Sequence, residues 1–259
     1  DGLLDTFDHI RDTMPVAKVI PEDPGLFEPF WFISRYDDVM RISKDNATFL
    51  NNPKPVVFSL TEAIEFSRKA TGSNMLVDSL VVFDAPVHPK YRKLTQDWFM
   101  PRNLKRIEDE IRALAERTVD AMIEQGPELD FVKAVSGPYP LHVVMQILGV
   151  PPEDEPRMMM LTQQMFGGQD KDLSGTGMDQ MTPEQVVQLV AGAVKSFEDY
   201  FAALAEERRA NPTDDVASVI ANALVDGEPL PPRDMAGYYI IVATAGHDTT
   251  SASTAGAMQ

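Results

Sequence analysis

Near its end the chain reads Ala245-Gly246-His247-Asp248-Thr249-Thr250. This stretch follows the apolar run from Tyr238 to Val242 and precedes the small residues from Ser251 to Ala257. The pattern predicts one helix over Asp234–Gln259, roughly 40 Å long at about 1.5 Å per residue. An acid and two hydroxyls would then lie inside an apolar, buried helix, where unpaired polar groups cost free energy. The stretch therefore needs a structural or a chemical explanation.

Two arrangements of this stretch are open on the sequence alone. In the first, Thr249 donates its hydroxyl to the carbonyl four residues back, that of Ala245, and Asp248 forms a buried ion pair. In the second, Thr249 points elsewhere, the Ala245 carbonyl stays free and the helix opens into a local groove. Gly246 carries no side chain, so a flat or small group could approach the backbone there. Asp248 could then relay protons to that group.

Composition limits the class of protein. The 259 residues include 23 basic and 40 acidic ones, for a net charge of −17, which argues against a nucleic-acid-binding protein. There is no cysteine, so a disulfide scaffold and a thiolate metal site are excluded within these residues. No apolar run reaches the roughly 18 residues of a membrane span. We expect residues 1–259 to form a single domain. We also expect the protein to be a cytoplasmic monomer that does not associate with a membrane.

The residue pattern predicts a mainly helical fold with a small β-sheet near the N-terminus. Val16–Ile20 and Pro29–Ser34 are predicted strands, joined through a Pro-Glu-Asp-Pro-Gly turn. Thr71–Pro86 is expected to be a long, partly ordered loop, of a kind that often has a function. The expected helices cover Asp5–Met14, Tyr36–Ser43, Leu60–Lys69, His88–Phe99, Leu104–Glu124, Tyr139–Leu148, Pro152–Phe166, Pro183–Ala210, Asp214–Leu224 and Asp234–Gln259.

Two basic residues form a second candidate site. His88 and Arg92 are four residues apart and so share one face of a helix. Such a pair of donors suits a carboxylate or a phosphate, although the spacing alone favours a solvated basic helix start. His142 lies on an apolar helix, where we expect a core histidine and not a metal ligand.

Several stretches resemble the cytochrome P450 monooxygenases. Residues 245–250 are similar to the central-helix signature of that family, Ala/Gly-Gly-x-Asp/Glu-Thr-Thr/Ser. His88-x-x-x-Arg92 is similar to the helix that contacts the haem propionates in the family. Within the family, the chain is most similar to the soluble bacterial α-terpineol hydroxylases. Further matching stretches are Phe83–Val87, Trp98–Leu104, Tyr139–Met145 and Leu148–Pro151.

The resemblance covers essentially the whole chain but only the N-terminal portion of a family member, through the central helix. It implies the cytochrome P450 fold, truncated after that helix. The family's Glu-x-x-Arg helix and its haem-ligating cysteine loop lie beyond this point. A cysteine thiolate on the iron favours O–O cleavage, and this sequence contains none. We therefore expect the chain to be part of a longer protein and inactive by itself.

The resemblance implies a haem-dependent monooxygenase. Its reaction would insert one oxygen atom of O2 into a small hydrophobic substrate, either a terpenoid or an aromatic or aliphatic hydrocarbon. Its cofactor would be heme b, and its electrons would come from a ferredoxin-type donor with an NAD(P)H-dependent reductase. Asp248 and Thr249 would be the catalytic pair that delivers protons to iron-bound dioxygen.

The resemblance also implies roles for binding residues. His88 and Arg92 would pair with the haem propionates, and Ala245 and Gly246 would lie over the distal face of the haem. The remaining candidates are apolar residues expected to line the substrate pocket. They are Met75, Leu76, Leu80, Val82, Met165, Phe166, Ile241, Val242 and Ala245.

Two other functions stay open. His247 and Asp248, together with His88 or His142, contain the elements of a metal-dependent hydrolase. Against it, adjacent residues diverge by about 100° on a helix, and the histidines lack a recognisable ligand spacing. The third possibility is a non-catalytic helical fragment that binds a small molecule.

Overall fold

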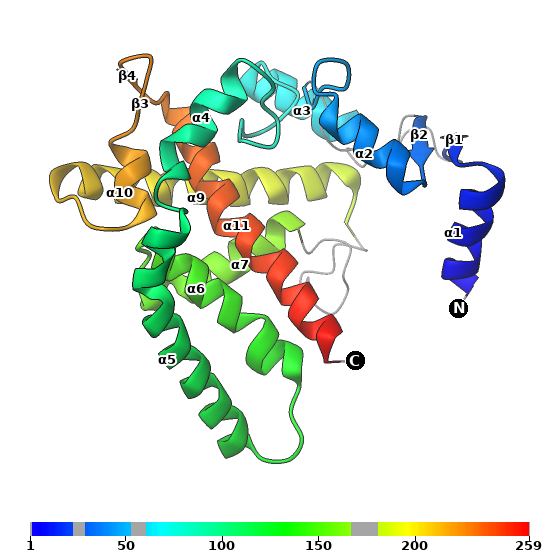
Figure 1. The fold of residues 1–259 in the computed structure, drawn as a ribbon. Coiled ribbons are helices and arrows are strands. Elements are labelled where there is room, and N and C mark those ends of the chain that lie inside the picture. Colours follow the sequence, from blue (N-terminus) through cyan, green and yellow to red (C-terminus); the bar gives the residue numbers. More distant parts are fainter. Residues whose placement is uncertain (1, 23–28, 53–60, 167–180, 259) are drawn as a thin grey trace.

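The computed structural model describes residues 2–22, 29–52, 61–166 and 181–258. Its elements confirm a mainly helical fold with a small antiparallel sheet near the N-terminus (Figure 1). In chain order they are α1 (Gly2–Thr13), β1 (Val16–Val19), β2 (Phe30–Ile33), α2 (Tyr36–Lys44), α3 (Thr61–Thr71), α4 (Val87–Gln96), α5 (Pro101–Gln125), the π-helical turn η1 (Val132–Ser136), α6 (Pro138–Leu148), the 3-10 turn η2 (Pro152–Asp154), α7 (Glu155–Phe166), α9 (Pro183–Ala210), α10 (Val216–Ala221), β3 (Leu224–Val225), β4 (Glu228–Pro229) and α11 (Pro232–Ala257).

Helix α11, red in Figure 1, crosses the middle of the helical bundle and packs against α6, α9 and η1. Pro232 occupies its first turn, where the missing N–H costs nothing, and Asp234 adds an acidic side chain there. The helix therefore begins two residues before the predicted start at Asp234. None of the described helices combines the length and the apolar character needed to cross a membrane.

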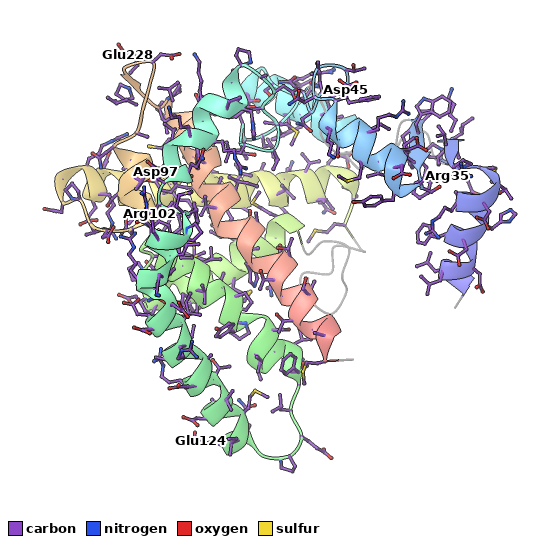
Figure 2. The ribbon with its side chains drawn as sticks, viewed as in Figure 1. Arg35, Asp45, Asp97, Arg102, Glu124 and Glu228 are labelled. Carbon is purple, nitrogen blue, oxygen red and sulfur yellow. The ribbon has the colours of Figure 1, made fainter. Side chains whose placement is uncertain are left out.

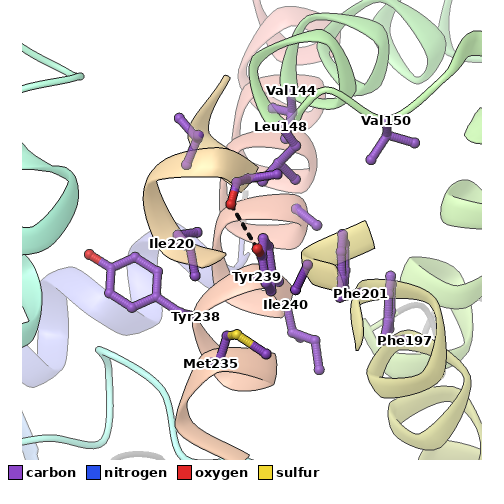
Figure 3. Packing of buried hydrophobic residues seen from close by; sticks show 14 of the residues in the cluster. Val144, Leu148, Val150, Phe197, Phe201, Ile220, Met235, Tyr238, Tyr239 and Ile240 are labelled. Atoms are coloured by element: carbon purple, nitrogen blue, oxygen red, sulfur yellow. Dashed lines mark hydrogen bonds between the residues drawn. The ribbon is translucent and has the colours of Figure 1, made fainter. Parts of the chain in front are cut away.

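Stacked aromatic rings join α9 to α11 in the core (Figure 3). The ring of Phe201 lies between those of Phe197 and Tyr239, with centroid distances of 5.9 and 4.9 Å and nearly parallel planes. The Tyr239 hydroxyl donates to the carbonyl of Ala217 at 2.8 Å, which ties α10 to the same cluster. Burying a tyrosine here is favourable because its polar tip is paired.

Helix α6 has a different entry from the one predicted. The turn η1 precedes it, and the N–H of Gly137 donates to the carbonyl of Val132, five residues back, at 2.9 Å. Pro138 and Pro140 have no N–H to donate, so the regular pattern of α-helical hydrogen bonds cannot run through this junction. At the other end of α6, Gly149 forms the C-terminal cap with a left-handed φ of 75°.

The predicted hairpin forms, with Val16 opposite Ile33 and Val19 opposite Phe30. A second hairpin, β3–β4, lies where a loop was expected, and the helix predicted over Asp214–Leu224 is confined to α10. Its turn is Asp226-Gly227, with φ values of 54° and 89°, as a two-residue hairpin turn requires. Glu228 marks this hairpin in Figure 2, and Glu124 marks the far end of α5.

The N-terminal elements lie to one side of the bundle (Figure 1). Helices α1 and α2 bury none of their residues among the described parts of the chain. The rings of Phe7 and Phe32, 6.1 Å apart, stack α1 on the hairpin. Helix α4 ends at Gln96, short of the predicted Phe99, because Asp97–Met100 turns with hydrogen bonds of its own.

Candidate functional site

Helix α11 runs without a break through residues 245–250. The Thr249 hydroxyl donates to the carbonyl of Ala245 at 2.8 Å. This is the threonine contact of the first arrangement left open by the sequence, and the groove expected in the second does not open here. The buried ion pair of Asp248 that belonged to the first arrangement is not formed, because that side chain is half-exposed. The hydroxyl is satisfied inside its own helix, as is common for threonine.

The acid and the hydroxyls of this stretch are not buried, contrary to expectation. The Asp248 side chain is 46% exposed, and Thr249 and Thr250 are exposed. The buried polar residues are instead Thr244 and His247, with exposures of 2% and 3%. The cause is helical phase, because the face that packs on α6 and α9 carries Thr244 and His247 while Thr249 points away from it.

His247 connects α11 to the start of α6. Its Nε2 lies 3.1 Å from the carbonyl oxygen of Gly137. A carbonyl oxygen only accepts, so Nε2 carries the proton. Nδ1 lies 3.1 Å from Oδ1 of Asp248, although the angle between the two groups is not that of a hydrogen bond. The adjacent side chains therefore meet, and Asp248 has a buried imidazole on one side and solvent on the other.

The space over Gly246 is occupied. A Cβ added at Gly246 would lie 2.8 Å from Cγ2 of Val144 on α6. A flat or small group cannot enter along the direction of the missing Cβ of Gly246, because the side chain of Val144 packs there. The small residue that stays open is its neighbour Ala245, which is exposed.

Helix α4 binds the N-terminal half of α11 through one face. The Tyr91 hydroxyl donates to Oδ2 of Asp234, and the Tyr238 hydroxyl donates to the carbonyl of Tyr91 at 3.1 Å. Oγ1 of Thr95 lies 2.9 Å from the Tyr238 hydroxyl. Burial, with the hydrogen bond to Asp234, raises the pKa of Tyr91 well above its usual value. These contacts fix α4 against the helix that carries Ala245.

His88 and Arg92 lie beside this face of α4. His88 is half-buried and Arg92 is exposed. Within the described ranges neither side chain forms a salt bridge with a carboxylate, whereas Lys90 contacts Asp226 at 2.5 Å. The pKa of Asp84 is lowered by backbone hydrogen bonds from Asn51 and Asn52, and the nearby charge of His88 adds to this. Burial raises the pKa of Tyr238, and the positive charge of Arg92 partly opposes that rise, which places Arg92 near α11. Two donors one helical turn apart are thus available to an anionic group.

The arrangement expected for a metal-dependent hydrolase is not found. Among the described residues, no three histidine or acidic side chains come together as metal ligands. Nδ1 of His142 lies 2.7 Å from Oε1 of Glu155, so this histidine joins α6 to α7. It is partly buried, as a structural histidine would be.

Comparison with known proteins identifies the family, although no family model matches the chain. The chain is 35% identical over 253 residues to cytochrome P450-terp of Pseudomonas sp, covering 97% of this chain and 58% of that protein. The crystal structure of CYP108D1 from Novosphingobium aromaticivorans is 60% identical and matches with a TM-score of 0.86. The match covers 99% of this chain and 59% of the CYP108D1 chain. The chain has the sequence and the fold of a cytochrome P450.

Other P450 relatives are named for different compounds. The steroid C26-monooxygenase of Mycolicibacterium smegmatis is 29% identical over 247 residues, which cover 93% of this chain and 53% of that enzyme. Further relatives are named as a methyl-branched lipid omega-hydroxylase and a linalool 8-monooxygenase. The chain thus spans about half the length of the P450 relatives that it matches.

The P450 family implies a haem iron, and the residues present are chemically suited to part of its site. The unpaired donors of His88 and Arg92 suit the two carboxylates at the haem edge. The exposed Ala245 offers a small residue beside a flat ring. The sequence has no cysteine, so a thiolate ligand is not among these residues.

The predicted pocket residues differ in their surroundings. Met75, Leu76 and Ile241 are half-buried and lie outside the core cluster. Val82 is buried, with an exposure of 4%, and its neighbour Val81 is 53% exposed. Leu80, Met165 and Val242 pack against the core, and the side chain of Phe166 lies outside the described residues.

Two residues that matter for this region were missed. Arg233 and Gly237 of α11 contact the loop that carries Met75 and Leu80. A glycine inside an otherwise regular helix is the sequence signal that could have indicated a close backbone contact. Nothing in the sequence indicates which segment meets it.

Proposed function

We propose that the protein containing this chain is a haem-dependent monooxygenase that inserts one oxygen atom of O2 into a small hydrophobic substrate. The observation that carries the proposal is the open face of α11, where Asp248 and Thr249 follow the exposed Ala245 in a P450 sequence. Apolar side chains on the loop before α4 favour a terpenoid or another hydrocarbon. A relative named linalool 8-monooxygenase supports the same class of substrate.

The haem, when bound, supplies the activation of dioxygen that an unreactive C–H bond requires. In this proposal His88 and Arg92 donate charged hydrogen bonds to the two haem carboxylates, and Ala245 leaves room for the ring. The thiolate ligand belongs to a residue outside this sequence. Electrons come from a ferredoxin-type donor with its NAD(P)H-dependent reductase, and the protein acts in the cytoplasm.

The chain's own residues move protons. The half-exposed carboxyl of Asp248 takes protons from solvent, and its Oδ1 lies 3.1 Å from Nδ1 of His247. Thr249 Oγ1 donates its hydrogen to the Ala245 carbonyl, so its lone pairs remain free to accept. In a relay, the Thr249 hydroxyl turns its hydrogen from the Ala245 carbonyl to the open side of the helix and releases it there, while Oγ1 takes a proton from Asp248 and the hydroxyl is restored.

The proton role is tested by Thr249→Ala in the complete enzyme. We expect substrate binding to be retained, while the fraction of NAD(P)H electrons recovered in product falls by roughly tenfold or more. The remaining electrons should appear as hydrogen peroxide. Thr249→Ser is the matched control because it keeps the hydroxyl. Unchanged coupling of NAD(P)H consumption to product in Thr249→Ala would refute the proton role.

Haem binding is tested separately by a spectrum of the complete, folded protein. Reduction under carbon monoxide should give the red-shifted Soret band of a thiolate-ligated haem. Arg92→Ala should lower the fraction of protein that retains haem, because one of the two charged donors is lost. Failure of the folded protein to incorporate haem would end the proposal.

A further inference from the structure

The loop between α3 and α4 is held by its own short polar side chains. We call residues 71–82 the α3–α4 loop. Oγ1 of Thr71 donates to the carbonyl of Ser67 at 2.7 Å and accepts from the N–H of Ser73 at 3.2 Å. The Ser73 hydroxyl donates to Asp78 at 3.2 Å and accepts from the N–H of Met75 at 3.3 Å. These bonds define the loop's conformation, but none of them fixes the loop to the rest of the molecule.

Arg233, in the first turn of α11, makes that attachment. Its Nε donates to Oδ2 of Asp78 at 2.6 Å, and its Nη2 donates to the carbonyl of Met75 at 2.7 Å. The side chains of Arg233 and Asp78 are 28% and 25% exposed, so the pair is partly shielded from water. The planar guanidinium contacts two points of the loop with fixed geometry, which a flexible ammonium cannot do.

Gly237, one turn further along α11, brings the two backbones into contact. A Cβ added at Gly237 would lie 1.7 Å from the carbonyl oxygen of Asp78. Backbone on both sides cannot yield as a flexible side chain can, so any larger residue must displace the loop. Arg233 and Gly237 thus act on the same loop residue, Asp78, through its side chain and its carbonyl.

These contacts lie on the row of α11 that leads to the proposed site. Residues four apart on a helix are neighbours on its surface, so the row runs from Arg233 through Gly237 and Ile241 to Ala245. Ile241 is half-buried and Ala245 is exposed. A displacement of the loop at Gly237 therefore changes the space beside Ile241, before it reaches Ala245.

We infer that Arg233 and Gly237 are positioning residues that hold the α3–α4 loop against α11 and so make the protein select hydrophobic substrates by size. The selectivity rests on the proposed function, since it needs a pocket walled by this loop and α11. With the loop held, Met75 and Leu76 stay close to the helix and larger substrates fit poorly. With the loop released, the wall moves outward and the preference for smaller substrates weakens.

The test uses the complete haem-loaded protein and two probes, the monoterpene alcohol linalool and the larger sesquiterpene alcohol farnesol. Their dissociation constants are measured from the change in the haem spectrum, and hydrogen–deuterium exchange of residues 71–82 is measured without ligand. We expect Arg233→Ala and Gly237→Ala to speed exchange in the loop. Both should shift the ratio of the two dissociation constants toward farnesol by about tenfold.

Three further variants sharpen the result. Asp78→Asn keeps the shape of the side chain and removes its charge, so it should shift the ratio in the same direction even if Arg233→Ala does not fold. Gly256→Ala, in the same helix with no atom within 4 Å of the added Cβ, should change neither measurement. Arg112→Ala removes an exposed ion pair with Glu108 and should also change neither.

The outcomes separate the attachment from the proposed function. Faster loop exchange with an unchanged ratio of dissociation constants would mean that the contacts only stabilise the loop, and would overturn the inference. Unchanged loop exchange in both Arg233→Ala and Gly237→Ala would overturn it as well. No spectral change with any ligand in the parent protein would contradict the proposed function and the selectivity together.

Discussion

His247 is a buried side chain that contacts both a neighbouring element and a half-exposed carboxylate. Its ring is almost fully enclosed, its Nε2 meets the carbonyl of Gly137, and its Nδ1 lies beside Asp248. The contact with Gly137 crosses from α11 to the turn before α6, so the ring stabilises the packing of these elements. The contact with Asp248 places this buried ring beside a half-exposed carboxylate.

Replacing His247 by Ala should destabilise the protein by about 1–3 kcal/mol. The Gly137 carbonyl loses its partner in a partly buried position, and the missing ring leaves a cavity. His247→Gln, which keeps a donor, should recover part of the loss. Urea unfolding monitored by circular dichroism measures both, with the exposed Thr250→Ala as the control. A destabilisation equal to that control would contradict the structural role of the ring.

At the scale of residues, the sequence predicted that polar residues lie within α11, but not which of their side chains face the core and which face solvent. The internal hydrogen bond of Thr249 was one of two predicted arrangements, because threonines in helices commonly make it. The meeting of His247 and Asp248 was not predicted, since helical geometry alone separates adjacent residues by about 100°. In the structure, Nε2 of the imidazole lies at the carbonyl of Gly137 and Nδ1 lies beside Asp248.

The contact between α6 and α11 depends on a glycine, Gly246, which has no side chain to keep the helices apart. Gly246 lets Val144 approach the backbone of α11, and both helices contribute buried residues to the same core. The same absence was expected to admit a flat ligand. The structure shows that a neighbouring helix uses the space.

Gly246→Ala should therefore destabilise the protein by about 1–3 kcal/mol, because the new methyl group meets Cγ2 of Val144 in a packed interface. Val144→Ala makes room for it, so the double variant should lose less than the sum of the two single losses. Chemical denaturation of the four proteins gives this interaction energy. Strict additivity would show that the two groups do not touch. Gly256→Ala, with open space around the added methyl, is the control.

At the scale of elements, explicit end signals were the most reliable. Helix α9 has the predicted bounds, Pro183–Ala210, because Thr182 forms a capping box with Gln185 and Asn211-Pro212 follows its end. The hairpin β3–β4 was missed although Asp226-Gly227 is a strong turn signal. Its strands are only two residues long, too short for an alternating pattern to be recognised.

At the scale of the whole molecule, buried tyrosines link stability to alkaline pH. Burial raises the pKa of Tyr239 above its usual value, and the negative charge of Asp215 adds to the effect. Burial also raises the pKa of Tyr238 and of Tyr91. Each of these tyrosines stays protonated when folded and ionises near pH 10 when unfolded. Their contribution is therefore complete below about pH 10 and is lost as the pH rises toward the folded pKa.

We expect the free energy of unfolding to fall above about pH 10, by up to about 1.4 kcal/mol per pH unit for each such tyrosine. Tyr239→Phe removes one of them and should make the fall shallower, although it also loses the bond to Ala217. Urea unfolding at several pH values, from about 8 to about 11, measures the slope. Tyr36→Phe, at a 74% exposed position, should leave it unchanged. Equal slopes for all three proteins would contradict the linkage.

The burial of α11 changes along its length, and this has a consequence for its dynamics. Every residue from Met235 to Ile240 is buried, whereas none of residues 251–258 is. Opening the first part requires the core to come apart, while the last turns can fray alone, so amide hydrogens at the two ends exchange by different routes. Asp248 and Thr249 lie at the boundary between the buried part of α11 and the last turns, which can fray alone. Arg233 and Gly237 contact the loop from the slowly exchanging end, so the loop is anchored on the part of the helix that opens last.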